Sequence, residues 1–389
     1  MNIGRTPPPQ VPLTVLTGFL GAGKTTLLNR LLRDPELADT VVLINEFGEI
    51  GLDHLLVENV SGDMLVLASG CLCCTIRGDL IATLEDLLRR RDNGRMAPFR
   101  RVIIETTGLA DPAPVLHTIM YHPYLMQRYG LDGVVTLVDA VNGGASLDAH
   151  PEAVKQAAVA DRLVLTKTDL LVSPEERSAA QALSRRLRAL NPAAPLLDAA
   201  KGEATAAALL NAGLYDPAGK SPDVQRWLNA EAYAAPDEGQ GDHSQHGHDH
   251  AGQDPHDVNR HDAHIRAFCM RSAVPIAPSS FDMFLEFLRA LHGPKLLRVK
   301  GMVALADHPD GPVVIHGVQH VFHPPLRVPA WPDADHSTRI VFIVRDMPPA
   351  FVEQLWGAFA GEAALDTPDA KALTDNPLAP GRGGLLGQR

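Results

Sequence analysis

The sequence lacks three features that would each point to a particular class of protein. It has no run of about 18 apolar residues and therefore no candidate membrane-spanning helix. Its first ten residues lack the apolar core of a secretory signal. Its formal net charge of −11 disfavours nucleic acid as a partner, because proteins that bind nucleic acid are usually basic. We therefore expect a cytoplasmic protein that binds neither a membrane nor nucleic acid.

Cysteine is scarce, and its placement is uneven. Only four cysteines occur in 389 residues, and three of them form the cluster Cys71-Leu72-Cys73-Cys74. A disulfide framework distributes its cysteines along the chain, so this cluster indicates metal binding or redox chemistry instead. Metal binding is the preferred interpretation, because thiolates bind Zn²⁺ tightly and favour soft or borderline metals. Redox chemistry and a plain structural role stay open. The fourth cysteine, Cys269, is expected in a strand of the core.

Apolar segments and helix-forming segments alternate over the first 200 residues. The predicted strands are 11–18, 40–46, 63–69, 101–107, 133–140 and 161–167. Helices are predicted from Lys24 onward and over 79–91 and 173–190. Continuous apolar strands separated by helices are typical of a parallel sheet with both faces covered. Residues 1–230 are therefore predicted to form an α/β domain with a mostly parallel sheet.

The pattern changes after residue 230. Residues 231–263 have almost no apolar periodicity and are rich in His, Asp and Gly, which predicts a disordered linker. Residues 264–360 are predicted to form a smaller α+β domain, and 361–389 a flexible tail. The elements expected in the smaller domain are a strand at 265–274, a helix at 279–292, several strands between 296 and 344, and a helix at 348–359.

A glycine-rich loop joins the first predicted strand to the first predicted helix. Residues 18–26, GFLGAGKTT, match G-x-x-x-x-G-K-[ST] in the strand–loop–helix context that this motif requires. Lys24 is predicted to reach the β- and γ-phosphates of a nucleotide as a catalytic residue, and the Thr25 hydroxyl to bind Mg²⁺. The domain is therefore expected to be a P-loop NTPase domain. The predicted nucleotide-binding residues of the loop are Gly18, Gly21, Ala22, Gly23, Lys24, Thr25 and Thr26.

Two further motifs follow apolar strands. Glu105 ends the strand RVIIE and begins the segment ETTG, which closes with Gly108, a further predicted nucleotide-binding residue. An acidic residue at this place lies near Mg²⁺ in P-loop enzymes, so Glu105 is predicted to be catalytic, acting on Mg²⁺ or on the attacking water. Capping of the next turn is the alternative role.

The second motif is Thr166-Lys167-Thr168-Asp169, which resembles the guanine-reading motif N/T-K-x-D. The carboxylate of Asp169 can accept hydrogen bonds from the guanine N1–H and 2-amino groups, which adenine lacks. Thr166, Lys167 and Asp169 are therefore predicted to select GTP, which water would convert to GDP and phosphate.

Five motifs occur in the order seen in one protein family: GFLGAGKTTLL (18–28), INEFGEIGLD (44–53), GCLCCTIRGDL (70–80), ETTGLADP (105–112) and LTKTDL (165–170). In these motifs the chain resembles the CobW family of GTPases, which are related to HypB and UreG. The resemblance implies a GTP-hydrolysing metallochaperone that couples GTP binding and hydrolysis to metal transfer. Its ligands would be GTP or GDP, Mg²⁺ and Zn²⁺, and its partner an unidentified client metalloprotein. A homo-oligomer is left open.

The resemblance also suggests how the metal is held. Cys71, Cys73 and Cys74 are the predicted zinc ligands. Glu46 is either an oxygen ligand beside them or a hydrogen-bonding residue of a switch loop. His122 is a weaker candidate, and an ordinary surface or interface histidine is favoured there. Insertion of cobalt or iron into a cofactor or metalloenzyme is the main alternative function. A metal-buffering or metal-sensing adaptor is another.

Histidine is concentrated in the predicted linker. Seven of the 17 histidines lie between His243 and His264. Neutral imidazoles bind Zn²⁺, Co²⁺ and related ions, so the segment is predicted to be a low-specificity metal reservoir or sensor. A solubilising linker with incidental histidines is the alternative. The predicted weak metal-binding residues are His243, His246, His248 and His250.

Overall fold

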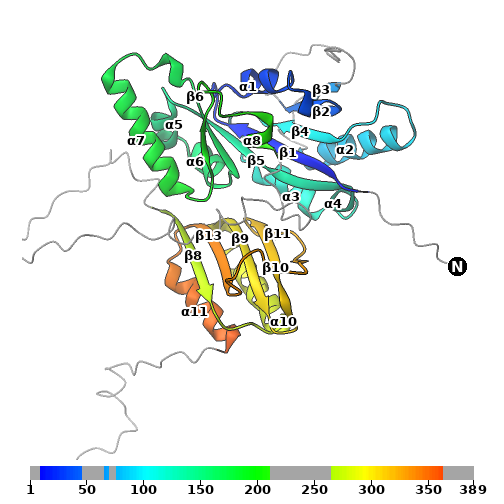
Figure 1. The fold of residues 1–389 in the computed structure, drawn as a ribbon, viewed down its shortest axis with the longest axis vertical. Coiled ribbons are helices and arrows are strands. Elements are labelled where there is room, and N and C mark those ends of the chain that lie inside the picture. Colours follow the sequence, from blue (N-terminus) through cyan, green and yellow to red (C-terminus); the bar gives the residue numbers. More distant parts are fainter. Residues whose placement is uncertain (1–8, 46–64, 70–75, 211–263, 362–389) are drawn as a thin grey trace, which may run out of the picture.

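The computed structural model describes residues 9–45, 65–69, 76–210 and 264–361 (Figure 1). Within these ranges the chain forms a seven-stranded sheet followed by a six-stranded sheet. The first sheet is parallel throughout, with the strand order β3-β2-β4-β1-β5-β6-β7. This arrangement confirms the predicted P-loop α/β class. The predicted linker 231–263 and the tail beyond Gly361 lie outside the described residues.

The strands of the first sheet are β1 (Val11–Gly18), β2 (Thr40–Asn45), β3 (Leu65–Ser69), β4 (Arg101–Glu105), β5 (Tyr129–Asp139), β6 (Arg162–Thr166) and β7 (Leu196–Asp198). The α-helices that accompany them are α1 (Lys24–Leu31), α2 (Ile76–Asp92), α3 (Ala113–Tyr121), α4 (Leu125–Arg128), α5 (Gly143–Ala149), α6 (Pro151–Ala158), α7 (Pro174–Leu190) and α8 (Ala206–Leu209). Two 3₁₀ turns, η1 (Pro35–Leu37) and η2 (Thr168–Leu170), complete this part of the chain.

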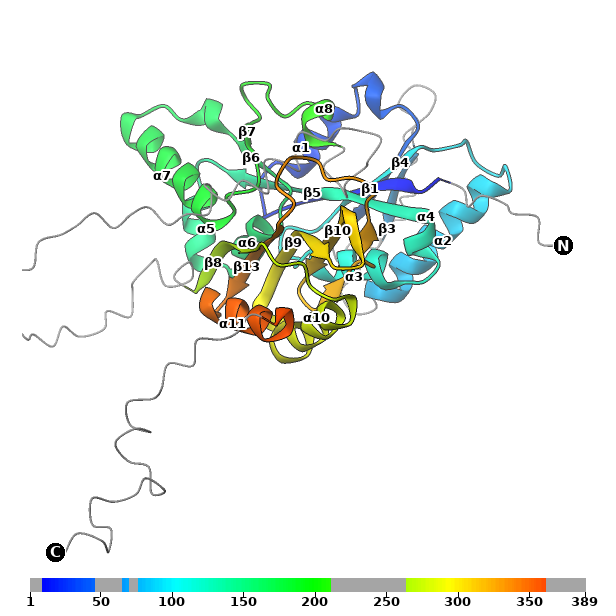
Figure 2. The same cartoon turned by 60° about the horizontal axis from the view of Figure 1, so that its bottom comes forward.

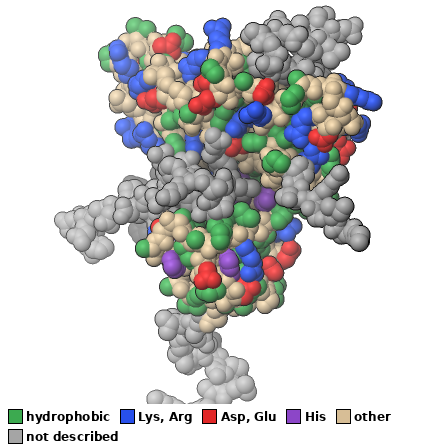
Figure 3. Space-filling model, turned by 45° about the vertical axis from the view of Figure 1, so that its right-hand side comes forward, with side chains coloured by type: hydrophobic (Ala, Val, Ile, Leu, Met, Phe, Trp, Pro, Cys, Tyr) green, Lys and Arg blue, Asp and Glu red, His purple; other side chains and the backbone are tan. Residues whose placement is uncertain are grey.

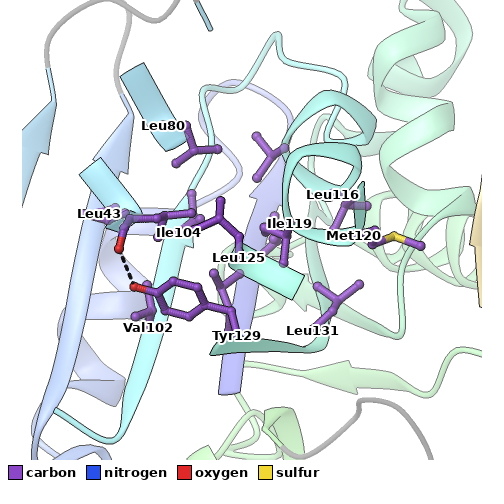
Figure 4. Close-up of a cluster of buried hydrophobic side chains, with 14 of the residues drawn as sticks. Leu43, Leu80, Val102, Ile104, Leu116, Ile119, Met120, Leu125, Tyr129 and Leu131 are labelled. Carbon is purple, nitrogen blue, oxygen red and sulfur yellow. Dashed lines mark hydrogen bonds between the residues drawn. The ribbon is translucent and has the colours of Figure 1, made fainter. Parts of the chain in front are cut away.

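Helices cover both faces of the parallel sheet, which explains why its strands are apolar on both sides. Side chains of α1, η1 and α8 pack against one face. Side chains of α2, α3 and α4 pack against the other face, together with α5, α6 and α7 further along the sheet. Strand β5 begins at Tyr129 rather than at the predicted residue 133, because the Tyr129 side chain is itself buried in this core. Its hydroxyl donates to the carbonyl oxygen of Leu84 at 2.9 Å (Figure 4).

The second sheet is antiparallel, with the order β11-β10-β9-β13-β8 and β12 paired to β10. Its strands are β8 (Ile265–Ser272), β9 (Leu296–Leu305), β10 (His308–Val318), β11 (Val321–Phe322), β12 (Leu326–Arg327) and β13 (Thr338–Arg345). Its helical elements are α10 (Pro278–His292), the 3₁₀ turn η4 (Gly293–Lys295) and α11 (Pro349–Ala360). Cys269 lies in β8 as predicted but is half-buried rather than in the core, because it alternates with Phe268 and Met270, which pack inward.

The second sheet lies between helices α10 and α11 and the first domain (Figure 2). Alternation along β9 sends Val299 and Val303 toward the helices. On the opposite face, Arg298 and Lys300 form ion pairs with Asp161 of the first domain. The two domains therefore share a buried, partly ionic interface. No helix in the described ranges is long and apolar enough to cross a membrane.

Candidate nucleotide-binding site

The predicted nucleotide-binding motifs gather at one edge of the parallel sheet. The phosphate loop follows β1, Glu105 ends β4, and Thr166 ends β6. Because all these strands are parallel, their carboxyl ends lie at the same edge, where α/β proteins bind their ligands. Segments up to 148 residues apart in the sequence, from Gly18 to Thr166, are brought together in this way.

The phosphate loop is held in the conformation that its glycines permit. Gly21 and Gly23 have φ angles of 71° and 86°, a region that side chains rarely adopt. The Lys24 ammonium donates to the carbonyl oxygens of Gly18 (2.9 Å) and Phe19 (3.2 Å), so the side chain folds over the loop that it is predicted to serve. The first amides of α1 follow directly, and together these groups form a site suited to phosphate oxygens.

Thr25 and Glu105 meet across the site. The Thr25 hydroxyl donates to the Glu105 carboxylate at 2.8 Å, although 80 residues separate them. Glu105 is only 2% exposed, whereas Thr25 is exposed. A hydroxyl and a carboxylate are oxygen donors of the kind that Mg²⁺ prefers, so this pair fits the predicted ion.

The segment after Glu105 packs directly on the phosphate loop. A Cβ atom at Gly108 would lie 2.6 Å from the backbone nitrogen of Leu20, so only glycine fits there. The buried side chain of Gln156, on α6, donates to the carbonyl oxygens of Gly108 (3.1 Å) and Ala110 (2.9 Å). Gln156 was not predicted from the sequence, because only the tertiary fold carries α6 to this segment.

The Thr166-Lys167-Thr168-Asp169 motif is tied to the phosphate loop and to β5. The Thr166 hydroxyl donates to the carbonyl oxygen of Ala22 at 2.8 Å and so links the motif to the phosphate loop. Lys167 has a left-handed backbone (φ 59°), and its ammonium lies 2.6 Å from the Asp139 carboxylate. The Asp169 side chain is exposed at this edge.

Asp139 is a further site residue that the sequence prediction missed. Burial alone would raise the pKa of Asp139, but hydrogen bonds from Lys167, Asn142 and the backbone N–H of residue 141 hold that pKa below its usual range. The carboxylate therefore stays charged and fixes the lysine. Its position at the end of the predicted strand 133–140 is the only signal that the sequence offers for it.

Most of the candidate zinc ligands lie outside the part of the chain that the structure describes. Glu46, Cys71, Cys73 and Cys74 lie outside the described residues, as do the linker histidines His243, His246, His248 and His250. His122 is described, and its Nε2 lies 4.0 Å from a carboxylate oxygen of Glu85. No group of three or more metal-ligating side chains occurs within the ranges that the structure describes.

These features define a P-loop GTPase. Residues 12–198 match the CobW/HypB/UreG nucleotide-binding domain, and residues 265–360 match the cobalamin synthesis protein CobW C-terminal domain. The zinc chaperone YjiA of Escherichia coli is 32% identical over 351 residues, which cover 90% of this chain and 98% of that protein. The chain therefore belongs to the CobW family, and the resemblance seen in its motifs is confirmed.

Two further comparisons agree with this assignment. The zinc-regulated GTPase metalloprotein activator 1 of Schizosaccharomyces pombe is 41% identical over 170 residues, covering 42% of this chain and 40% of that protein. The crystal structure of Zn(II)-bound YjiA GTPase from E. coli is similar with a TM-score of 0.63 and 27% identity. The match covers 90% of this chain and 99% of the YjiA chain.

Proposed function

We propose that this GTPase is a cytoplasmic metallochaperone that binds Zn²⁺ through Cys71, Cys73 and Cys74 and transfers it to a client metalloprotein. The observation that supports this proposal is the position of β2 between β3 and β4 in the parallel sheet. Asn45 at the end of β2 pairs with Ser69 at the end of β3, and Ile44 pairs with Glu105. The chain leaves β2 toward Glu46 and leaves β3 toward Cys71, from neighbouring strands at one edge.

This topology supports a coupling between nucleotide and metal. The thiol motif follows a strand that is separated from the Glu105 strand by β2 alone. A change in the loops at this edge on GTP hydrolysis would therefore change the geometry available to the thiolates. By reciprocity, zinc would change nucleotide affinity. Glu46 is the proposed oxygen ligand, and Co²⁺ would compete for the same donors. The four linker histidines named above are proposed as weaker sites.

On the nucleotide side, Lys24 would bind the β- and γ-phosphates, Asp169 would accept from the guanine edge, and Thr25 with Glu105 would hold Mg²⁺. When bound, Mg²⁺ would neutralise part of the negative charge on the phosphates. Water attacks the γ-phosphate and gives GDP and phosphate. The name of each relative cited above, a zinc chaperone and a zinc-regulated activator, agrees with zinc as the transported metal.

The test replaces Cys73 and Cys74 together by serine. A neutral hydroxyl replaces a soft thiolate, so we expect Zn²⁺ affinity, measured by chelator competition, to fall by several orders of magnitude. GTP binding is expected to persist. Turnover should no longer respond to Zn²⁺. Cys269→Ser is the matched control, because that thiol is half-buried in β8 of the second domain.

Tight zinc binding in the double variant would contradict the proposal, as would an unchanged effect of zinc on its turnover. If wild-type turnover followed thiol oxidation instead of zinc, the redox interpretation would replace it. Tighter retention of Co²⁺ than of Zn²⁺ by the wild type would assign the same site to cobalt insertion.

A further inference from the structure

The turn between β10 and β11 inserts from the second domain into the core of the first. Val318 and Val321, at its two ends, are 0% and 7% exposed and belong to the apolar cluster that contains Ile119 and Met120 of α3. Figure 4 shows Leu116, Ile119 and Met120 of α3 within this cluster. A two-residue turn thus has apolar anchors on both sides, and the first domain provides their packing.

Polar contacts attach the same turn to the segment that leads from Glu105 into α3. The Gln319 side-chain amide donates to the Asp111 carboxylate at 3.3 Å. The buried ring of His117, on α3, lies with Nε2 2.9 Å from the carbonyl oxygen of Val318, so Nε2 carries the proton. Both contacts join residues about 200 positions apart, and both reach the element that follows the catalytic strand β4.

Asp111 is the point where several restraints on this segment meet. Its second carboxylate oxygen accepts from the backbone N–H of Ala113 (2.9 Å) and so holds the start of α3. The oxygen that faces Gln319 also accepts from Lys155 of α6 at 3.1 Å. Six residues upstream is Glu105, which contacts Thr25. The segment between them has no helix or strand of its own. Its start is bonded to β1 through the Thr106 backbone N–H, its middle to Gln156, and its end is held by the contacts of Asp111.

One side of the turn is not filled by packing. A cavity of about 350 Å³ lies there, and His117, His122 and His320 are among its lining residues. Figure 3 shows a histidine side chain at the junction of the two domains on this face. The polar contacts of Gln319 and Val318 and the two valine anchors hold the turn from the first domain, and Arg289 holds it from its own domain by donating to the His320 carbonyl oxygen at 3.1 Å.

We propose that this turn of the C-terminal domain positions the Glu105 segment for GTP hydrolysis. Gln319 and Asp111 are the positioning residues, and they act through the segment 106–110 on Glu105. Catalysis requires reacting groups to be held closely, and a displacement of about 1 Å can cost about a hundredfold in rate. The inference depends on GTP hydrolysis and not on zinc, so it stands or fails independently of metal transfer.

The test exchanges the hydrogen-bonding roles of Gln319 and Asp111, and GTP turnover is measured as the release of phosphate. Gln319→Glu removes the donor and places a second carboxylate against that of Asp111, a repulsion that Lys155 offsets only in part. It should lower kcat about tenfold, with KM for GTP within about twofold of the wild-type value. Gln319→Ala should cause a smaller loss, about threefold. Asp111→Asn combined with Gln319→Glu restores a donor–acceptor pair with the roles reversed, and should recover most of the kcat lost in Gln319→Glu.

Asp307→Asn is the matched control, since it breaks an ion pair with Arg327 that lies wholly within the second domain. Its kcat should equal that of the wild type. Thermal unfolding of all variants shows whether a loss of kcat comes from a loss of folding. Recovery of kcat in the double variant separately tests positioning, because a contact with a purely structural role would not restore kcat. Unchanged or increased kcat in Gln319→Glu, a loss that appears in KM instead, or no recovery in the double variant would overturn the proposal.

Discussion

At the scale of single residues, close contacts decide which side chains the nucleotide site accepts. Gly108 lies against the Leu20 backbone, so the conformation of the phosphate loop depends on a residue outside that loop. Thr166 contacts the Ala22 carbonyl oxygen, and Asp139 fixes Lys167. The phosphate loop is thus connected to the motif at residues 166–169, which is predicted to read guanine.

Gly108→Ala should weaken GTP binding by about tenfold or more, because its Cβ would lie 2.6 Å from the nitrogen and 2.7 Å from the Cα atom of Leu20. Backbone cannot move aside as a flexible side chain does, so the phosphate loop must shift. A fluorescent GTP analogue measures the change. Gly144→Ala in α5 is the control, since no atom lies within 4 Å of its added Cβ, and alanine favours the helix. Equal affinities for both variants would contradict the packing argument.

At the scale of elements, strand β9 joins the two domains through charge. Arg298 and Asp161 form an ion pair at 2.5 Å, with side chains 5% and 3% exposed, and Lys300 contacts the same carboxylate. Burial alone would raise the pKa of Asp161, but Arg298 and Lys300 hold it well below its usual range. The second carboxylate oxygen accepts from the backbone N–H of Val134 at 2.8 Å, which ties the pair to β5.

Asp161→Asn should lower the free energy of unfolding by about 3 to 5 kcal/mol, because it leaves a buried guanidinium without its counter-charge. Urea unfolding followed by circular dichroism measures this loss. Glu286→Gln is the control: its ion pair with Arg289 lies at the surface and should contribute about 1 kcal/mol or less. Similar decreases in the free energy of unfolding in both variants would show that burial does not increase the contribution of the Asp161 ion pair to stability.

At the scale of the whole molecule, the buried interface makes stability depend on pH. His316 of β10 is 4% exposed. Burial, followed by the positive charges of Arg298 and Lys300, holds the pKa of His316 well below 6.5, while Asp161 partly opposes them. The nearby His323 also lowers the pKa of His316. The folded protein therefore keeps this imidazole neutral where the unfolded chain takes up a proton.

The sign of the effect follows from linkage. Because the folded pKa of His316 is the lower one, its contribution to stability is complete above about pH 6.5 and is lost as the pH falls below that value. We expect the free energy of unfolding to decrease toward pH 5 by up to about 1.4 kcal/mol per pH unit from this residue. His316→Leu should remove that part of the slope in urea unfolding at several pH values. An identical slope in wild type and variant would exclude His316 as the source.

Local chemistry made much of this protein predictable from its sequence. The phosphate loop is a contiguous motif between a strand and a helix. The apolar runs predicted six of the seven strands of the parallel sheet, and β7 was missed because a three-residue strand has too little pattern. The role of Thr25 was predicted from the phosphate-loop motif, and those of Glu105, Thr166 and Asp169 from motifs that follow apolar strands. The structure brings these residues to one edge of the sheet. The thiol and histidine metal sites stay predictions.

Most strands of the parallel sheet, the nucleotide motifs and the family could be predicted from the sequence, because each of these depends on residues close together in the chain. Only the tertiary structure decided the strand order, the Asp139–Lys167 pair and the fit of Gly108 against Leu20. It also decided the attachment of Gln319 to Asp111 across 208 positions. The physical reason is that these contacts arise when long-range burial of apolar faces brings distant segments together, and no local spacing records which polar groups then meet.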